Sequence, residues 1–181
     1  MNLTLLYGVF AMAITLVVSN YLVQFPLGDW LTLAAFTYPI AFLVTDCVNR
    51  SAGVSVAAKV ALFGFIFGVP LSLAFNYFTA TDGGWLAAVR IAAASGMAFA
   101  IGQGTDIAIF NRLRKRAWWL PPLFSSLPAS ILDTALFFSL AFAGTDVPWV
   151  TLAWGDLAIK ALMLLLLLPP YRLLTKQWKI A

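Results

Sequence analysis

Residues 37–50 read Thr37-Tyr-Pro-Ile-Ala-Phe-Leu-Val-Thr-Asp-Cys-Val-Asn-Arg50, a hydrophobic run that turns polar towards its end. In a membrane helix this pattern places Thr45, Asp46 and Asn49 near one end of an otherwise apolar span. A carboxylate in such a position is costly to bury, and by default it marks a functional site whose other members must be found. The stretch therefore predicts a membrane span together with one part of a polar site.

The composition of the whole chain is that of a polytopic membrane protein. Its 181 residues are 62% hydrophobic and 10% charged, whereas soluble domains carry about 25% charged residues. The net charge of +4 would suggest nucleic-acid binding on a folded surface. Here the basic residues stand in short segments between apolar runs, where they act as topology signals. We therefore expect a lipid bilayer around the chain and no nucleic-acid partner.

The cysteine and histidine content excludes several kinds of site. The chain has no His and a single cysteine, Cys47, so it can form neither an internal disulfide nor a multi-cysteine metal site. We expect no metal and no cofactor. Residues 1–24 lack a basic start and a small-residue cleavage site, and they predict a retained transmembrane helix rather than a signal peptide.

Six apolar segments are long enough to cross a bilayer, because about 20 apolar residues span it as a helix. Turn-forming or charged residues separate them, and continuous apolar runs favour helices over the alternating pattern of a membrane barrel. The sequence predicts an all-α integral membrane protein in which residues 1–181 form one domain of six transmembrane helices. The expected spans are residues 3–24, 31–50, 58–78, 86–110, 122–143 and 150–171.

The charges between the spans predict the orientation of the chain. Nine of the eleven Lys and Arg residues fall on one side, and the positive-inside rule assigns that side, with both termini, to the cytoplasm. The other side carries Asp29, Asp82 and Asp146, with Arg90 as its single base. Tryptophans mark the predicted span ends, as in an interfacial aromatic belt: Trp30, Trp85, Trp118, Trp119, Trp149 and Trp178.

Few polar side chains remain inside the predicted spans, and two pairs of them stand out. Asp46 and Asn49 are three residues apart and share a helix face, as do Gln103 and Asp106. Each pair combines a carboxylate with an amide.

Two charges lie deeper in the membrane. Asp133, which precedes Thr134, and Lys160 are each near the middle of a span, so both must face the bundle interior. An unpaired carboxylate there needs a cation, and Lys160 is the central one, so we expect the two to pair in the empty protein. Isolated buried charges are costly, so we expect one shared cavity, near the midplane or the cytoplasmic half, formed by Asp46, Asn49, Gln103, Asp106, Asp133 and Lys160.

Structural roles compete with this interpretation. Asp46 and Asp106 could instead be helix-end acids paired with nearby arginines of the interface. Asp156 lies four residues before Lys160, and the two could form a structural pair within one helix. Asp133 has the fewest structural explanations, because it is a lone carboxylate at mid-span.

The residue types favour ligand binding over catalysis. Carboxylates, amides and one lysine contain no nucleophile–base pair, so we expect no enzymatic activity. A planar heterocycle whose ring N–H lies beside an exocyclic amine fits a carboxylate, its carbonyl suits an amide or ammonium, and aromatic faces hold its plane. Those are the edges of a guanine-like base, but an amino acid or a cation also fits this composition.

Four motifs stand in order along the chain: Tyr38-Pro39…Phe42-Leu43-x-Thr45-Asp46-x-x-Asn49, Gly102-Gln103-x-x-Asp106-x-x-Ile109-Phe110, Leu132-Asp133-Thr134-Ala-Leu-Phe137-Phe138, and Ile159-Lys160…Pro169-x-Tyr171. Together they resemble the queuosine-precursor transporter family, also called the VUT family, over nearly the whole chain. The resemblance implies a six-helix protein of the bacterial inner membrane, similar in fold to the substrate-binding subunits of energy-coupling-factor transporters.

The resemblance also implies a substrate. Such a protein would import a 7-deazaguanine base, 7-cyano- or 7-aminomethyl-7-deazaguanine (preQ0 or preQ1), for the queuosine modification of tRNA. Further copies of the chain are candidate partners besides the substrate and the bilayer. The substrate-binding residues would be Asp46, Asn49, Gln103, Asp106, Asp133, Thr134 and Lys160.

Two alternatives stay open from the sequence. One is a permease for another purine-like base or for a vitamin. The other is an intramembrane structural or assembly protein whose buried charges bind a partner helix.

The predicted orientation can be tested at the end of the chain. A reporter that is active only in the periplasm should be silent when fused after Ala181, because the basic segments hold that end in the cytoplasm. A strong periplasmic signal from this fusion would reverse the orientation.

Overall fold

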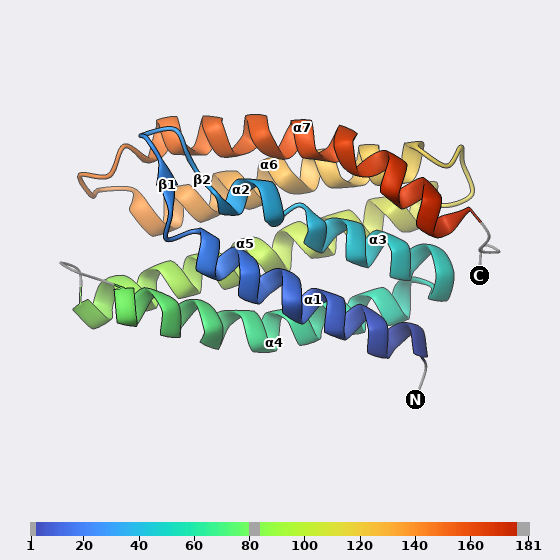
Figure 1. The fold of residues 1–181 in the computed structure, drawn as a ribbon, viewed down its shortest axis with the longest axis horizontal. Helices are drawn as coiled ribbons and strands as arrows, with labels where there is room; N and C mark the ends of the chain where they lie inside the picture. Colours follow the sequence, from blue (N-terminus) through green and yellow to red (C-terminus); the bar gives the residue numbers. More distant parts are fainter. Residues whose placement is uncertain (1–2, 80–83, 177–181) are drawn as a thin grey trace.

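The structure is a computed structural model that describes residues 3–79 and 84–176. Within these ranges, five helices are long and apolar enough to cross a membrane, and they run side by side along one axis (Figure 1). They confirm five of the predicted spans as continuous helices, with ends that differ by up to four residues. The helices are α1 (Leu3–Leu22), α4 (Val54–Thr79), α5 (Gly84–Leu113), α6 (Leu120–Phe142) and α7 (Trp149–Thr175).

The second predicted span, residues 31–50, is wrong as a continuous helix. Its first residues belong to a hairpin of strands β1 (Pro26–Leu27) and β2 (Leu31–Thr32), whose turn begins at Gly28 with φ +63°, a conformation that favours glycine. The rest is divided into α2 (Ala34–Thr37) and α3 (Ile40–Ala52). Pro39 causes the division, because it has no N–H to donate to the preceding turn. Tyr38 and Pro39 keep helical backbone angles, so the chain continues in the same direction.

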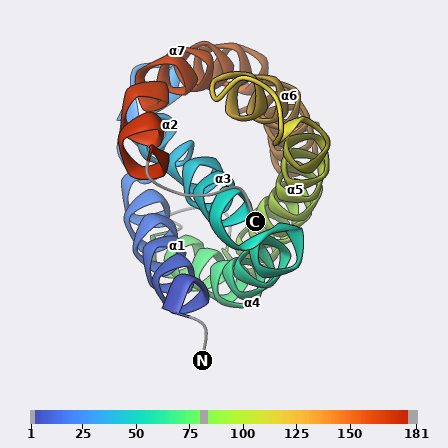
Figure 2. The same ribbon diagram turned by 90° about the vertical axis from the view of Figure 1, so that its right-hand side faces the viewer.

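Seen along the bundle axis, the long helices and α2 form an oval, and α3 runs through its interior (Figure 2). Helices α1 and α4 pack against one apolar side of α3, with Met12, Val48 and Val60 at the centre of that contact. The polar side of α3 carries the buried residues Thr45, Asp46 and Asn49. These side chains therefore face other helices and not lipid.

The two ends of the bundle differ in charge. Helix α1 begins and α7 ends at the same end as the connections around residues 53 and 117 (Figure 1). We call this the basic end, and it carries Arg50, Lys59, Arg112, Arg114, Lys115, Arg116, Arg172 and Lys176. The opposite end, the hairpin end, carries the β1–β2 hairpin, Asp29, Arg90 and Asp146.

The grouping of charges expected from the sequence is thus present, and its assignment to the cytoplasm stays a prediction. Asp82, Trp178 and Lys179, which also entered that expectation, lie outside the described residues.

The hairpin is fixed to the start of α7. Thr151 Oγ1 lies 3.1 Å from the carbonyl oxygen of Asp29 and 2.7 Å from that of Pro148, and its one proton can be donated to either. One turn further, Gly155 lies against the Trp30 carbonyl so closely that a Cβ atom there would overlap it. Gly155 therefore allows a backbone contact that no larger residue permits.

We expect Gly155→Ala to displace the hairpin from α7 and to lower the midpoint of thermal unfolding in detergent, because overpacking a tight contact costs about 1–3 kcal/mol. The matched control is Gly104→Ala, since a Cβ atom at that helical glycine meets no atom within 4 Å. The control should unfold at the wild-type temperature or above. Equal behaviour of the two variants would contradict the tight hairpin contact.

Candidate functional site

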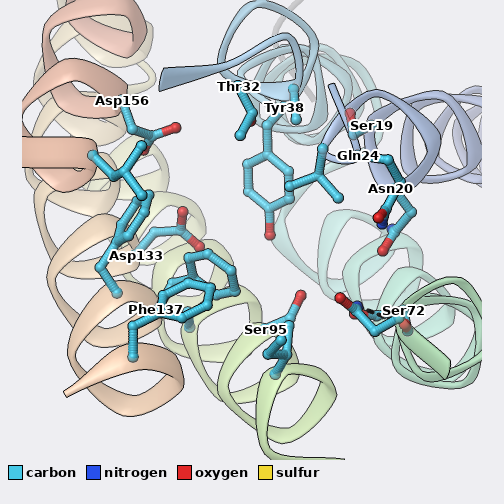
Figure 3. Close-up of a pocket in the computed structure, with 18 of the residues that line it drawn as sticks. Ser19, Asn20, Gln24, Thr32, Tyr38, Ser72, Ser95, Asp133, Phe137 and Asp156 are labelled. Carbon is cyan, nitrogen blue, oxygen red and sulfur yellow. Dashed lines mark hydrogen bonds between the residues drawn. The ribbon is translucent and has the colours of Figure 1, made fainter. Parts of the chain in front are cut away.

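A cavity of about 210 Å³ lies in the half of the bundle nearer the hairpin end. Its wall comes from the second halves of α1, α4 and α6, the residues just after α1 and the first halves of α5 and α7. Thr32, Ala34 and Tyr38 complete it. Figure 3 shows that Tyr38 projects between the acids of α6 and α7 and the polar residues of α1 and α4, with its hydroxyl in the open centre. Polar groups on the wall include Ser19, Asn20, Gln24, Ser72, Asn76 and Ser95, and aromatic ones include Phe137, Phe138 and Phe142.

The Lys160 ammonium forms the charged centre of this wall. It is 2.8 Å from Asp133 Oδ2, 2.6 Å from Asp156 Oδ2 and 3.0 Å from Thr134 Oγ1. Thr134 in turn donates to Asp156 Oδ2 at 2.8 Å. A lysine has three N–H donors, so these three oxygen atoms account for all of them. The expected pairing of Lys160 with Asp133 is confirmed, as is its pairing with Asp156.

Two carboxyl groups surround one ammonium at the cavity wall, so acidic groups outnumber the cation there. The contacts within this group use Oδ2 of Asp133 and Oδ2 of Asp156, and each carboxylate keeps its Oδ1 outside them. Figure 3 places Asp133, Asp156 and Phe137 on the same side of the cavity. The wall therefore offers hydrogen-bond acceptors beside aromatic surfaces, which suits a planar ligand with N–H donors.

Two further wall residues were absent from the predicted site. Tyr38 lies with its ring centroid 5.1 Å from Lys160 Nζ, a cation–π distance, and Asp156 completes the lysine's contacts. The sequence did hold a signal for Tyr38, because it precedes the helix-breaking Pro39 in the first motif. The polar end of α1, with Ser19 and Asn20, had no comparable signal.

A second polar cluster lies nearer the basic end. Ser126 of α6 donates to Asp106 Oδ1 of α5 at 2.8 Å, and its hydroxyl is 3.5 Å from Asp46 Oδ2 of α3. We call Asp46 and Asp106 the carboxylate pair. Asp46 is 2% exposed and Asp106 is fully buried, and the cavity wall includes neither of them.

Two amides of the predicted site accompany the carboxylate pair. Thr45 Oγ1 is 2.9 Å from Gln103 Oε1, to which it can donate. Asn49 Nδ2 donates to the carbonyl oxygen of Ile107 at 3.3 Å. These contacts hold α3 against α5 beside the carboxylate pair.

The predicted residues thus fall into two clusters and not into one cavity. Asp133, Thr134 and Lys160 meet at the cavity, whereas Asp46, Asn49, Gln103 and Asp106 meet around the carboxylate pair. The separation arises because α3 passes through the bundle interior, where its buried Phe42 follows Tyr38 by one turn. On α6, Ser126 and Asp133 are seven residues apart, or about 10 Å along a helix.

The alternative of interfacial ion pairs for Asp46 and Asp106 is not what the structure shows. Arg50 donates through Nη1 to the carbonyl oxygen of Arg114 at 2.7 Å. Within the described ranges, both ion pairs belong to Lys160. The same residues contain no group of three or more His, Cys, Asp or Glu side chains that could hold a metal ion.

Comparisons with known proteins place the chain among membrane transporters. Residues 32–174 match the sequence model of a family described as "Putative vitamin uptake transporter". The chain is 37% identical over 180 residues to the queuosine precursor transporter of Escherichia coli (strain K12), covering 86% of this chain and 79% of that protein. It is 32% identical over 164 residues to the probable queuosine precursor transporter of Haemophilus influenzae (strain ATCC 51907 / DSM 11121 / KW20 / Rd), covering 77% and 70%. No solved structure shows significant similarity to the chain.

The contacts of Lys160 predict unequal effects of two substitutions. Lys160→Met leaves two buried carboxylates without their cation, whereas Asp133→Asn leaves Lys160 paired with Asp156. Removing one partner from a buried ion pair costs about 3–5 kcal/mol, so Lys160→Met should lower the unfolding temperature in detergent far more than Asp133→Asn. An equal or smaller effect of Lys160→Met would show that the ammonium does not hold this group together.

Proposed function

Because the chain belongs to the vitamin uptake transporter family, we propose that it imports a queuosine precursor, 7-cyano- or 7-aminomethyl-7-deazaguanine, across a bacterial inner membrane. Two relatives named as queuosine precursor transporters support this, one of them at 37% identity over 180 residues. The observation that carries the proposal is the cavity wall, where the carboxyl groups of Asp133 and Asp156 lie beside phenylalanine rings. Transport of such a base requires no catalysis, so we propose no enzymatic role.

In this proposal residues 1–181 form one domain with six transmembrane segments, in which α2 and α3 together make the sixth. Its fold would be similar to that of the substrate-binding subunits of energy-coupling-factor transporters. The basic end and both termini lie in the cytoplasm, because eight of the eleven Lys and Arg residues stand at that end within the described part of the chain. The cavity then lies in the outer half of the membrane, on the side from which an imported ligand arrives.

The chemistry of the wall matches the edges of a 7-deazaguanine. Its ring N–H and exocyclic amine are donors for Asp133 Oδ1 and Asp156 Oδ1, and its ring stacks on Phe137 or Phe138. Lys160 has no free donor, so the carbonyl of the base is left to Tyr38 or to the amides of α1. A cavity of about 210 Å³ is below the roughly 300–1,000 Å³ of drug-sized ligand sites, which favours a single base.

The remaining predicted residues take part later in transport. Asp46, Asn49, Gln103 and Asp106 lie between the cavity and the basic end. We propose that they contact the ligand once the bundle opens on that side. First binding then uses Asp133, while Lys160 and Thr134 hold the carboxyl groups of the wall in position.

The two alternative functions, another permease and a structural protein, differ in how well the cavity wall fits them. A permease for another purine-like base or for a vitamin would use the same acceptors, and the family description favours this candidate over a structural protein. A structural protein would direct its charges at a partner helix. Here Asp133 is 3% exposed and Lys160 is 4% exposed, and both lie within the chain's own bundle.

Asp133→Asn tests the proposal directly. It keeps the shape of the side chain but removes the charge that receives the ligand's N–H edge, so uptake of labelled preQ1 by cells should be lost while the protein still accumulates in the membrane. Asp146→Asn, the same substitution at an exposed residue between α6 and α7, serves as the matched control and should transport normally. Wild-type uptake by Asp133→Asn would exclude this carboxylate from binding, and loss of the protein itself would give Asp133 a structural role.

A further inference from the structure

The carboxylate pair lacks the hydrogen bonds that two ionised acids require. Asp46 and Asp106 both reach the Ser126 hydroxyl, at 3.5 Å and 2.8 Å. A hydroxyl has one proton to donate, so it can serve only one carboxylate at a time. Asp46 Oδ1 and Asp106 Oδ2 are buried without a hydrogen-bond partner in the described part of the chain.

Among the described residues, no cation forms an ion pair with Asp46 or Asp106. The ion pairs within residues 3–79 and 84–176 both belong to Lys160, at the cavity. Arg50, one turn after Asp46, is held at the carbonyl oxygen of Arg114. Arg112 of α5 and Lys59 of α4 are exposed.

The other titratable neighbours are neutral groups. Cys47 lies beside Asp46 on α3, and Tyr171 of α7 packs against Cys47. The Tyr171 hydroxyl has no partner among the described residues, and α6 contributes the hydroxyls of Ser125 and Ser126. The one titratable residue that α1 contributes to the described chain near this end, Tyr7, is 67% exposed.

We propose that Asp46 and Asp106 share one exchangeable proton, and that this proton couples transport to the proton gradient; the inference rests on the proposed transport function. Two negative charges on adjacent buried carboxylates repel each other and lack solvation. One proton removes one charge and supplies the donor that the unpartnered oxygen atoms lack. Buried acids of membrane proteins commonly act as such proton sites.

Polar side chains occupy the face of α6 between the carboxylate pair and the cavity. Ser126, Ser130 and Asp133 follow one another at intervals of four and three residues, so they lie on one face of α6. Ser130 is fully buried, yet its hydroxyl has no partner among the described residues. Gln103, one turn before Asp106 on α5, also has a buried unpartnered Nε2. Because a hydroxyl both donates and accepts, Ser130 can relay a proton between Asp133 and the pair.

The same helices carry both clusters, which provides the coupling. Tyr38 and Asp46 stand on α3 and its preceding turn, Ser95 and Asp106 on α5, and Asp133 with Ser126 on α6. Opening the basic end separates α3 from α5 and α6 and breaks the contacts at Ser126. Release of the shared proton leaves two like charges, which favours that separation. One proton is thus taken up from the hairpin end with the ligand and released at the basic end.

Infrared difference spectroscopy of the purified, ligand-free protein tests the proton site alone. At neutral pH the wild type should show the carbonyl stretch of a protonated buried carboxylic acid, and the band should be lost or shifted in Asp106→Asn and Asp46→Asn. Asp146→Asn should keep it. A wild-type protein without this band, or variants that retain it unchanged, would overturn the proposal, and the wild-type spectrum decides even if a variant fails to fold.

Uptake into proteoliposomes tests the coupling, with radiolabelled preQ1 as the probe. With an acidic exterior, wild type and Asp146→Asn should concentrate preQ1 inside, and a protonophore should abolish this. Wild type should also exchange internal for external preQ1 without a gradient, since exchange needs no net proton movement. Asp106→Asn should lose accumulation about tenfold, and its remaining uptake should no longer respond to external pH or to the protonophore. Accumulation driven by a sodium gradient, or unchanged in Asp106→Asn, would overturn the coupling. Absence of any wild-type exchange would instead contradict the proposed function, and the infrared band would still decide the proton site.

Discussion

Inside an apolar bundle, the Lys160 ammonium can remain charged only where several oxygen atoms reach it at once. Asp133 and Thr134 of α6 and Asp156 of α7 meet this requirement at 2.6–3.0 Å. The contact fixes both the distance and the rotation of α7 relative to α6, because Thr134 also bonds Asp156. Gly102 contributes from α5, where even a Cβ atom would come within 3.2 Å of Asp133 Cβ. The charged group thus sets the positions of three helices and leaves its spare acceptors at the cavity.

The interruption at Pro39 serves the same site. A continuous helix over residues 31–50 would leave no room for the hairpin, which packs on α7 at Gly155. With the interruption, Tyr38 lies over Lys160 at the cavity while α3 continues into the bundle interior. The buried side of α3 can then carry Thr45, Asp46 and Asn49 away from lipid. One proline therefore separates a residue of the cavity wall from the residues that close the bundle beyond it.

The sequence predicts those features that depend on hydropathy and charge count. It gives five continuous spans, the common end of the basic residues and the pairing of Lys160 with Asp133, since mid-span charges have few alternatives. It misses the hairpin, because a run of apolar residues hides the effect of Gly28 and Pro39 on the backbone. It also places Asp46 and Asp106 in one cavity with Asp133. Helical spacing shows which residues share a face, but depth along the bundle depends on how far α3 enters it, and that is a property of packing.

The cavity and the carboxylate pair lie at different depths on the same helices. This arrangement fits a carrier better than a channel. A channel requires a continuous path, whereas here Phe42 and Thr45, at 1% and 0% exposure, fill α3's part of the interior between Tyr38 and the carboxylate pair. Ligand can pass only if α3 moves against α5 and α6, and that movement must break the bonds at Ser126, Gln103 and the Ile107 carbonyl. Of these bonds, those at Ser126 contact the carboxylate pair directly and therefore depend on its charge. In the proposed mechanism the two clusters, at different depths on the same helices, would link access at the hairpin end to closure at the basic end.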